Sequence, residues 1–200
     1  MEVPCFPIVI SQMNILKQFS MTLIRYQFLQ LILRFSVKTV FLIQKRQLNL
    51  SITIKDHQSK QFVVWGIGEF RNDRADVKYV QCESEVHLLK EFLAFWENNQ
   101  PDIITGWNTE FFDIPYLCNR IHKLFGEDEV KRLSPWRSVQ SREVFQMGRK
   151  HQIYDIQGIA HLDYFDLYRK FTYTNQESYR LDHIAFVELG ERKDGNPFDT

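Results

Sequence analysis

The stretch "DIITGWNTEFFDIPYL", residues 102 to 117, runs from an apolar segment through Gly-Trp-Asn to two phenylalanines, an aspartate and a proline. The apolar segment predicts a buried strand, and the residues from Pro115 predict a helix that ends at Gly126. Asp113 is therefore expected where a strand passes into a helix, at the sheet edge where α/β proteins usually bind ligands. By spacing alone, Asp113 is either the N-cap of that helix or a ligand-binding carboxylate, and Asn108 is either a turn residue or part of the same site.

The segments on the N-terminal side predict an α/β domain. "SITIKD" (51–56) and "QFVVWGI" (61–67) read as two strands joined by a polar turn, and "VKYVQC" (77–82) reads as a third. Residues 84–99 predict a helix capped by Ser84, with Val86, Leu89, Leu93 and Trp96 as its apolar stripe. This order of elements predicts a mixed sheet with flanking helices.

The overall composition sets limits on function. The 200 residues are 44% hydrophobic and carry no net charge, so the chain can form a sizeable core, and DNA affinity would have to come from local patches. The three cysteines form no C-x-x-C pair, which argues against a disulfide framework or a zinc site and favours a reducing compartment. We expect a cytoplasmic protein.

The first third differs from the rest. Residues 3–55 contain seven Lys or Arg and no Asp or Glu, and the first glycine of the chain is Gly66. We therefore expect a boundary near residue 50, with 1–50 and 51–200 as separate parts. Charged residues interrupt the apolar runs before they reach the ~18 residues of a spanning helix, so no membrane segment is expected. A secretory signal is not expected either, and the remaining interpretation is a translation in the wrong reading frame.

A family resemblance rests on several stretches. "GWNTEFFDIPYL" resembles the second exonuclease motif of family B DNA polymerases. "CNRIHKLFGEDEVKRLSPWR", "YDIQGIAHLDYFDLYRKFTYTNQESYRLDHIA" and "KDGNPF" resemble, in the same order, the exonuclease domain of the replicative polymerases of tailed phages. The similarity covers about residues 51 to 200. It implies a ribonuclease-H-like mixed sheet with flanking helices and a proofreading 3′→5′ exonuclease that removes the last nucleotide of a primer.

The resemblance also implies a site. In the family, two Mg²⁺ or Mn²⁺ ions clamp the scissile phosphate. Asp113 matches the motif's metal-binding carboxylate, and Asn108 matches the residue that orients the site. Phe111 and Phe112 would form apolar walls, mainly by core packing, with stacking on the frayed 3′ base as the alternative. The implied partners are the DNA primer-template and its single-stranded 3′ end, the rest of the polymerase, and a sliding clamp.

A basic segment follows the motif. Between residues 131 and 150, Glu143 alone opposes Lys131, Arg132, Arg137, Arg142, Arg149 and Lys150. By resemblance, the region from about Arg137 to Gly148 is a β-hairpin that helps to part primer from template, with Arg137 and Arg142 as DNA contacts. An ordinary solvated surface is the alternative. Asp163 and Asp166 fall outside the family's catalytic motifs and are expected to be structural.

Two of the family's motifs are missing. No Asp-Ile-Glu occurs before residue 51, and the third motif, a Tyr followed four residues later by Asp, would lie beyond residue 200. We therefore expect a chain that is incomplete at both ends and inactive as a nuclease. Read one base out of register, residues 31–51 can encode Asp-Ile-Glu-Val and a Phe-Pro segment, which makes residues 1–50 an expected frameshift product. The alternative is a non-catalytic piece of a split polymerase that binds single-stranded DNA or docks with another piece.

Overall fold

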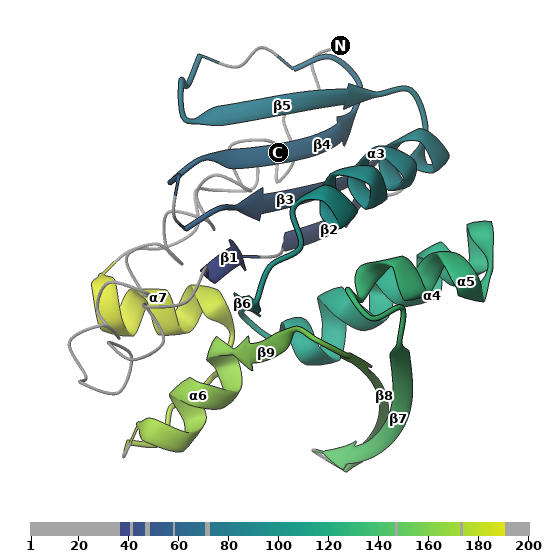
Figure 1. The fold of residues 1–200 in the computed structure, drawn as a ribbon. Coiled ribbons are helices and arrows are strands. Elements are labelled where there is room, and N and C mark those ends of the chain that lie inside the picture. Colours follow the sequence, from purple (N-terminus) through teal and green to yellow (C-terminus); the bar gives the residue numbers. More distant parts are fainter. Residues whose placement is uncertain are drawn as a thin grey trace.

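A computed structural model describes residues 37–40, 42–46, 49–57, 59–70, 73–146, 148–172 and 174–190, with the backbone alone up to residue 50 (Figure 1). The strands are β1 (Val37–Val40), β2 (Leu42–Arg46), β3 (Asn49–Lys55), β4 (Phe62–Ile67), β5 (Val77–Cys82), β6 (Ile103–Gly106), β7 (Val139–Gln146), β8 (Arg149–Ile156) and β9 (Ala160–Asp163). The helices are α3 (Glu85–Asn98), a π-helix η1 (Thr109–Asp113), α4 (Ile114–Phe125), α5 (Glu127–Val130), a 3-10 helix η2 (Lys131–Leu133), α6 (Tyr164–Phe171) and α7 (Leu181–Leu189).

The strands form two adjoining sheets and a separate hairpin. One sheet has the order β2-β3-β4-β5, with β2, β3 and β4 antiparallel and β5 parallel to β4. The other has the order β1-β6-β9 and is wholly parallel. A single residue separates β1 from β2, so the two sheets meet there. The mixed α/β architecture predicted from the sequence is confirmed, including the hairpin of β3 and β4 and the third strand β5.

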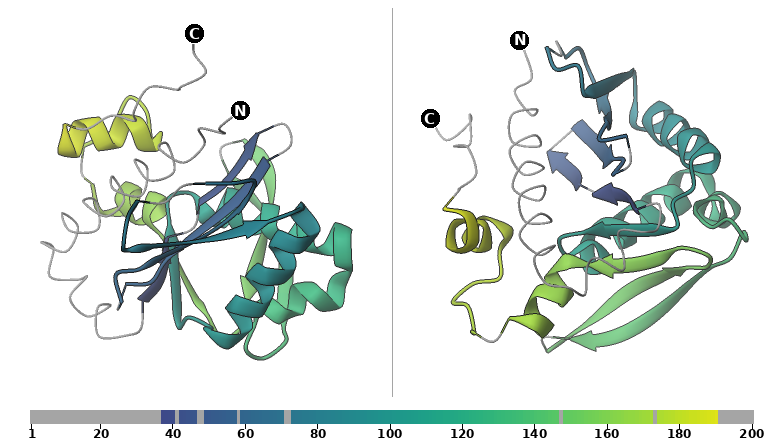
Figure 2. Two further views of the ribbon diagram at one scale, coloured as in Figure 1. Left: turned by 90° about the horizontal axis from the view of Figure 1, so that it is seen from above. Right: turned by 60° about the vertical axis from the view of Figure 1, so that its left-hand side comes forward.

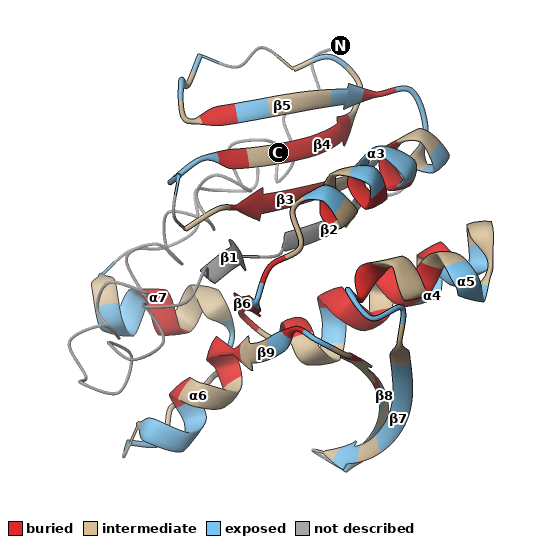
Figure 3. Ribbon diagram, viewed as in Figure 1, coloured by how far each residue is buried: buried red, intermediate tan, exposed pale blue. Residues whose placement is uncertain are grey.

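Helix α3 packs on the first sheet. Ser84 caps it by accepting a hydrogen bond from the His87 N–H, as the sequence predicts. Its buried face differs from the predicted stripe at one place, because Val86 is 41% exposed. The buried face includes the other three predicted residues and two more. Its members are Leu88, Leu89, Phe92, Leu93 and Trp96. In Figure 3, buried and exposed positions alternate along α3, as expected for a helix with one face packed on a sheet.

The main core lies between α3, the first sheet and α4. The Trp65 ring of β4 meets Phe92 of α3 edge to face, with 5.5 Å between centroids. Trp96 donates its indole N–H to the Leu133 carbonyl oxygen at 2.8 Å, which fixes η2 beside α3. Because this indole is 2% exposed, the hydrogen bond satisfies two polar groups that water could not reach.

A second, smaller core holds the last two helices. Trp107, directly after β6, packs with Tyr164, Phe165 and Tyr168 of α6 and with Ile184 of α7. Helices α6 and α7 therefore lie on one side of the molecule, and α3 and α4 lie on the other (Figure 2). The parallel strands β6 and β9 end between these two groups: β6 leads into the turn, η1 and α4, which carry the candidate site, and β9 leads into α6.

The N-terminal expectations fall mostly outside the described residues. Of residues 1–50, the structure describes the backbone of 37–40, 42–46 and 49–50, which lies in strands. The backbone of β1 and β2 occupies the sheet position between β3 and β6. The printed sequences of these two strands, VKTV and LIQKR, contain no carboxylate.

Candidate exonuclease site

Asp113 lies where strand β6 has turned into helix α4. The chain leaves β6 at Gly106, makes a left-handed turn at Asn108 (φ 62°), and continues through the π-helix into α4, with Pro115 in the first turn of that helix. Asp113 has helical backbone angles and its side chain makes no capping hydrogen bond, so the N-cap interpretation is wrong. Its side chain is 4% exposed, at the carboxyl edge of a parallel sheet.

Asn108 starts the turn that presents Asp113. A left-handed conformation is uncommon for any residue except glycine, and asparagine tolerates it better than most. The Asn108 carbonyl oxygen accepts a hydrogen bond from the Phe112 N–H at 3.1 Å, and its own N–H donates to the Asp163 carboxylate at 2.8 Å. Asn108 is thus at least the turn residue that the sequence suggested, and its position in the predicted site remains an expectation.

The two phenylalanines occupy different environments. Phe111 is half-buried and meets the His151 ring of β8 edge to face, with 5.4 Å between centroids. Phe112 is 53% exposed and stacks on Tyr116, one turn further along, at an interplanar angle of 18°. The expectation of core packing is therefore wrong for Phe112. The exposed part of the Phe112 ring offers a flat apolar surface to a planar ligand such as a nucleobase.

A hairpin is present as predicted, but it spans Val139 to Ile156, so its second strand lies beyond the predicted range of about Arg137 to Gly148. Strands β7 and β8 pair in antiparallel register from Val139 with Ile156 to Gln146 with Arg149, and the hairpin lies next to α4 and η1, which β8 contacts (Figure 1). Most of β7 is exposed (Figure 3). Arg142 donates to Asp155 on the facing strand at 2.8 Å, and its Nη2 lies 3.8 Å from Glu110 Oε1 on the π-helix. Arg142 therefore links the hairpin to the turn that carries Asp113.

A polar pocket of about 370 Å³ lies between the hairpin, β9 and the π-helix. Burial raises the pKa of the Glu110 carboxyl, an effect to which nearby Asp163 adds and which Arg142 opposes. Burial also lowers the pKa of His161 to about 4, against a smaller opposing effect of Asp155. The pocket is lined by Ile104, Glu110, Arg142, Tyr154, Asp155, Ile156, Gln157, Gly158, Ile159 and His161.

The basic segment is not an unopposed patch. Arg137 is ion-paired with Glu97 of α3 at 2.6 Å, and its side chain is 62% exposed. The acidic partners come from other elements or from the preceding short helix, which the sequence alone did not reveal. The remaining pairs are Lys131 with Glu127 and Asp128, Arg132 with Glu97 and Glu129, Arg142 with Asp155 and Glu110, and Lys150 with Glu143. Glu143 is the only acidic residue within 131–150, but residues outside this segment neutralise much of its charge, and DNA contact by Arg137 and Arg142 stays a prediction.

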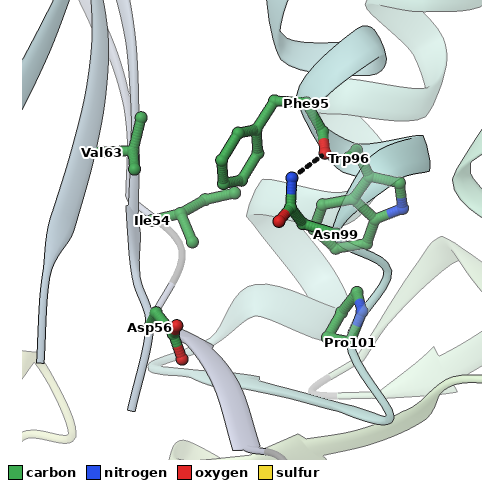
Figure 4. Close-up of a pocket in the computed structure, with 7 residues that line it drawn as sticks. All are labelled: Ile54, Asp56, Val63, Phe95, Trp96, Asn99 and Pro101. Carbon is green, nitrogen blue, oxygen red and sulfur yellow. Dashed lines mark hydrogen bonds between the residues drawn. The ribbon is translucent and has the colours of Figure 1, made fainter. Parts of the chain in front are cut away.

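A smaller cavity lies elsewhere, between the first sheet and the end of α3 (Figure 4). Its volume is about 40 Å³, and the apolar side chains of Ile54, Val63 and Phe95 take up much of its wall. Asn99 borders it and donates a hydrogen bond to the Phe95 carbonyl oxygen at 2.9 Å. This space is large enough for little more than a water molecule and contains none of the predicted site residues.

Comparison with known proteins identifies the domain. Residues 41–184 match the model of the DNA polymerase family B exonuclease domain. The chain belongs to this family. Its mixed α/β structure is consistent with the ribonuclease-H-like fold expected from the resemblance.

The matching relatives are polymerases. The chain is 48% identical over 115 residues, 58% of its length, to the DNA-directed DNA polymerase of Escherichia phage RB69, and 41% identical over 123 residues, 62% of its length, to that of Enterobacteria phage T4. It is 31% identical over 133 residues, 64% of its length, to the DNA polymerase catalytic subunit of Psittacid herpesvirus 1. These matches span only 13%, 14% and 12% of the respective relatives.

Sequence reasoning gave Glu110 and His161 no role in this region of the family B exonuclease domain, and it predicted Asp163 to be structural without identifying what it holds. Asp163 and His161 of β9 contact the Asn108–Glu110 turn, and Glu110 faces the hairpin. The hydrogen bonds of Asp163 agree with the predicted structural role. The available signal for Asp163 was its position at the end of a second apolar strand, directly before a helix, since neighbouring parallel strands end at the same edge.

In the described part of the chain, no helix has both the length and the apolarity needed to cross a bilayer.

Proposed function

We propose that this chain is the proofreading 3′→5′ exonuclease region of a replicative DNA polymerase, that it engages the 3′ end of a primer, and that it does not itself hydrolyse DNA. The family match supports the first part. The observation that supports the second part is the turn after β6, which leads to the buried Asp113 and leaves the preceding residue, Phe112, 53% exposed.

The residues present do not supply the set of carboxylates that the two-metal site of the family needs. Two hard cations need several oxygen ligands, which carboxylates usually supply. Among the described residues, no group of three or more His, Cys, Asp or Glu is arranged to hold a metal ion. Strand β1, one of the two neighbours of β6, carries no carboxylate, and in the full sequence Glu2 is the only acidic residue before Asp56. Asp113 is thus the one described carboxylate that matches a ligand of the family's Mg²⁺ or Mn²⁺ site, which supports the proposed inactivity.

Hydrolysis is tested with the purified chain and a 3′-labelled single-stranded oligonucleotide in Mg²⁺ and, separately, in Mn²⁺. We expect no shortening of the oligonucleotide beyond a buffer control. An intact family B exonuclease serves as the positive control. Shortening that Asp113→Ala abolishes would contradict the proposed inactivity, because it would mean that Asp113 acts with ligands other than the two expected carboxylates.

Binding of the 3′ end is tested separately. Stacking of a base on an aromatic side chain contributes about 1–3 kcal/mol, so Phe112→Ala should weaken binding of a short single-stranded oligonucleotide by about tenfold in fluorescence anisotropy. Trp136 is 71% exposed on the turn after η2, so Trp136→Ala is a matched control for the loss of an exposed aromatic ring. Equal effects of the two substitutions would argue against a specific role for Phe112.

We also propose that residues 1–50 are read out of frame relative to the rest. The absence of Asp and Glu between residues 3 and 54, and of Gly and Ala over the same range, supports this proposal. Sequencing the DNA tests it directly. The shifted frame should encode Asp-Ile-Glu between Leu31 and Ser51, and a stop codon or a different tripeptide in that interval would refute the proposal.

A further inference from the structure

The carboxylate of Asp163 bridges the ends of two parallel strands. Asp163 is the last residue of β9, directly opposite Gly106, the last residue of β6. Its Oδ1 accepts hydrogen bonds from the Asn108 N–H at 2.8 Å and from the Phe165 N–H at 2.9 Å. One carboxylate therefore contacts both the turn that leads to Asp113 and the first turn of α6.

The second oxygen completes the contact with the turn. Asp163 Oδ2 accepts from the Glu110 N–H at 2.9 Å and from the Thr109 hydroxyl at 3.4 Å. The amides of Asn108 and Glu110 stand at the start of the π-helix, where backbone N–H groups have no partner within the helix. A carboxylate that accepts from both is a strong, charge-assisted partner for them.

The environment makes this arrangement sensitive to the loss of either partner. Asp163 is 5% exposed and Thr109 is 1% exposed. Burial raises the pKa of the Asp163 carboxyl, whereas the hydrogen bonds from Glu110, Phe165, Asn108 and Thr109 act in the opposite direction. A buried N–H that loses its acceptor has no water to replace it, so the turn would have to rearrange.

Strand β9 contacts the turn after β6 at a second point. The Thr109 hydroxyl lies 2.8 Å from Nε2 of His161, which is two residues before Asp163 on β9 and on the same face of the strand. The left-handed turn at Asn108 is therefore fixed from β9, a strand distant in sequence, and not by capping interactions of its own side chain.

We propose that Asp163 is a positioning residue, which holds the Asn108–Glu110 backbone so that the π-helix delivers Asp113 to the edge of the sheet. The proposal rests on the proposed function only in treating Asp113 as the site carboxylate. A plain helix cap would need the Phe165 contact alone. The contacts with Asn108 and Glu110 are what distinguish a positioning role from capping of α6.

The two substitutions Asp163→Asn and Asp163→Ala separate these roles. Asparagine keeps one oxygen, which can still accept from Asn108 and Phe165, but it places an NH₂ donor against the Glu110 N–H. Alanine removes all four contacts. Asp166→Asn is the matched control, because Asp166 lies three residues further on and its carboxylate pairs with Lys170 at 2.6 Å.

The measurement is amide hydrogen exchange, resolved by residue with NMR, on the full chain and its three variants. In Asp163→Asn, we expect the Glu110 amide to exchange about tenfold faster while the Phe165 amide changes by less than about threefold. In Asp163→Ala, the amides of Asn108, Glu110 and Phe165 should all exchange faster. In Asp166→Asn, all three should exchange at the wild-type rate.

Two results for Asp163→Asn would contradict the proposal. If Asp163→Asn leaves the Glu110 amide unchanged, or accelerates Glu110 and Phe165 alike, Asp163 is only a helix cap and the proposal is wrong. Oligonucleotide binding, measured on the same samples by anisotropy, separates this outcome from a failure of the proposed function. A wild-type chain that binds no DNA would count against the proposed engagement of a primer 3′ end, whereas selective exchange at Glu110 would still establish the positioning role.

Discussion

Lowering the pH should destabilise this fold through His161. The imidazole lies on β9 against the π-helix, with its Nε2 2.8 Å from the Thr109 hydroxyl. Asp155, Glu110 and Arg142 line the same pocket, and Asp155 slightly raises the pKa of the ring. Burial dominates, and it lowers the pKa of His161 from 6.5 to about 4.

The magnitude follows from this pKa. Between pH 6.5 and pH 4, the unfolded chain binds a proton at this histidine while the folded chain does not, so the unfolded state gains stability. The contribution of His161 to the stability of the folded state is therefore fully present above pH 6.5 and is lost as the pH falls through the folded-state pKa. A pKa lowered from 6.5 to about 4 corresponds to about 3 kcal/mol in the free energy of unfolding, of which about 2 kcal/mol is lost by pH 5.

The assay is urea unfolding followed by circular dichroism at pH 7, 6, 5 and 4.5. His161→Gln is the control variant, because the glutamine amide can keep a hydrogen bond to Thr109 but does not titrate. The difference between the two proteins isolates His161 from His57, whose pKa is also lowered by burial, and from Glu110, whose pKa is raised. We expect the wild type to lose about 2 kcal/mol more than the variant between pH 7 and pH 5.

Parallel pH profiles for the two proteins would refute this reasoning. They would mean that His161 is solvated in the folded state or that it gains a compensating partner when protonated, with Asp155 as the nearest candidate by its effect on the pKa. An NMR titration of the His161 ring in the folded protein distinguishes these two explanations. A midpoint near 6.5 indicates solvation, and a midpoint above 6.5 indicates pairing with a carboxylate.

Three further substitutions test the scaffold by urea unfolding. Trp96→Phe should destabilise the fold by about 1–3 kcal/mol because the Leu133 carbonyl oxygen loses its buried donor, and Trp96→Leu should be no milder. Gly158→Ala should cost more than about 1 kcal/mol, since the glycine has φ +90° and the new Cβ would lie 2.5 Å from Pro135 Cγ; no loss would mean that this turn readily adapts. Ser84→Ala should cost about 1 kcal/mol and Ser84→Gly only a few tenths, and equal losses would argue against side-chain capping of α3.

The regular elements were predictable because their signals are local. The strands β3, β4 and β5 follow β-branched and aromatic runs, and α3 starts at Ser84, whose side chain can cap a helix without help from the rest of the fold. Local periodicity was less reliable for burial. Val86 fits the helical stripe but lies at the exposed edge of α3, because the sheet that covers the helix extends over Leu88 and Phe92 instead.

The charged residues could not be assigned from local sequence. Arg137 and Arg142 belong to a basic run, yet their partners Glu97, Glu110 and Asp155 come from other elements. Ion pairs between residues distant in the chain leave no periodic signal. The exposure of Phe112 was missed for a similar reason, since nothing in the FF pair indicates which ring the hairpin covers.

The sequence by itself determined the family, the order of strands and helices, and the place of Asp113 after a buried strand, because motif identity and hydrophobic periodicity are properties of neighbouring residues. Only the tertiary structure decided how the turn around Asp113 is held. The acceptor for the Asn108 and Glu110 amides is Asp163, more than fifty residues away, and it reaches them because β6 and β9 run parallel and end at the same edge. Hydrogen bonds of this kind depend on which strands become neighbours, and that is settled when the sheet forms.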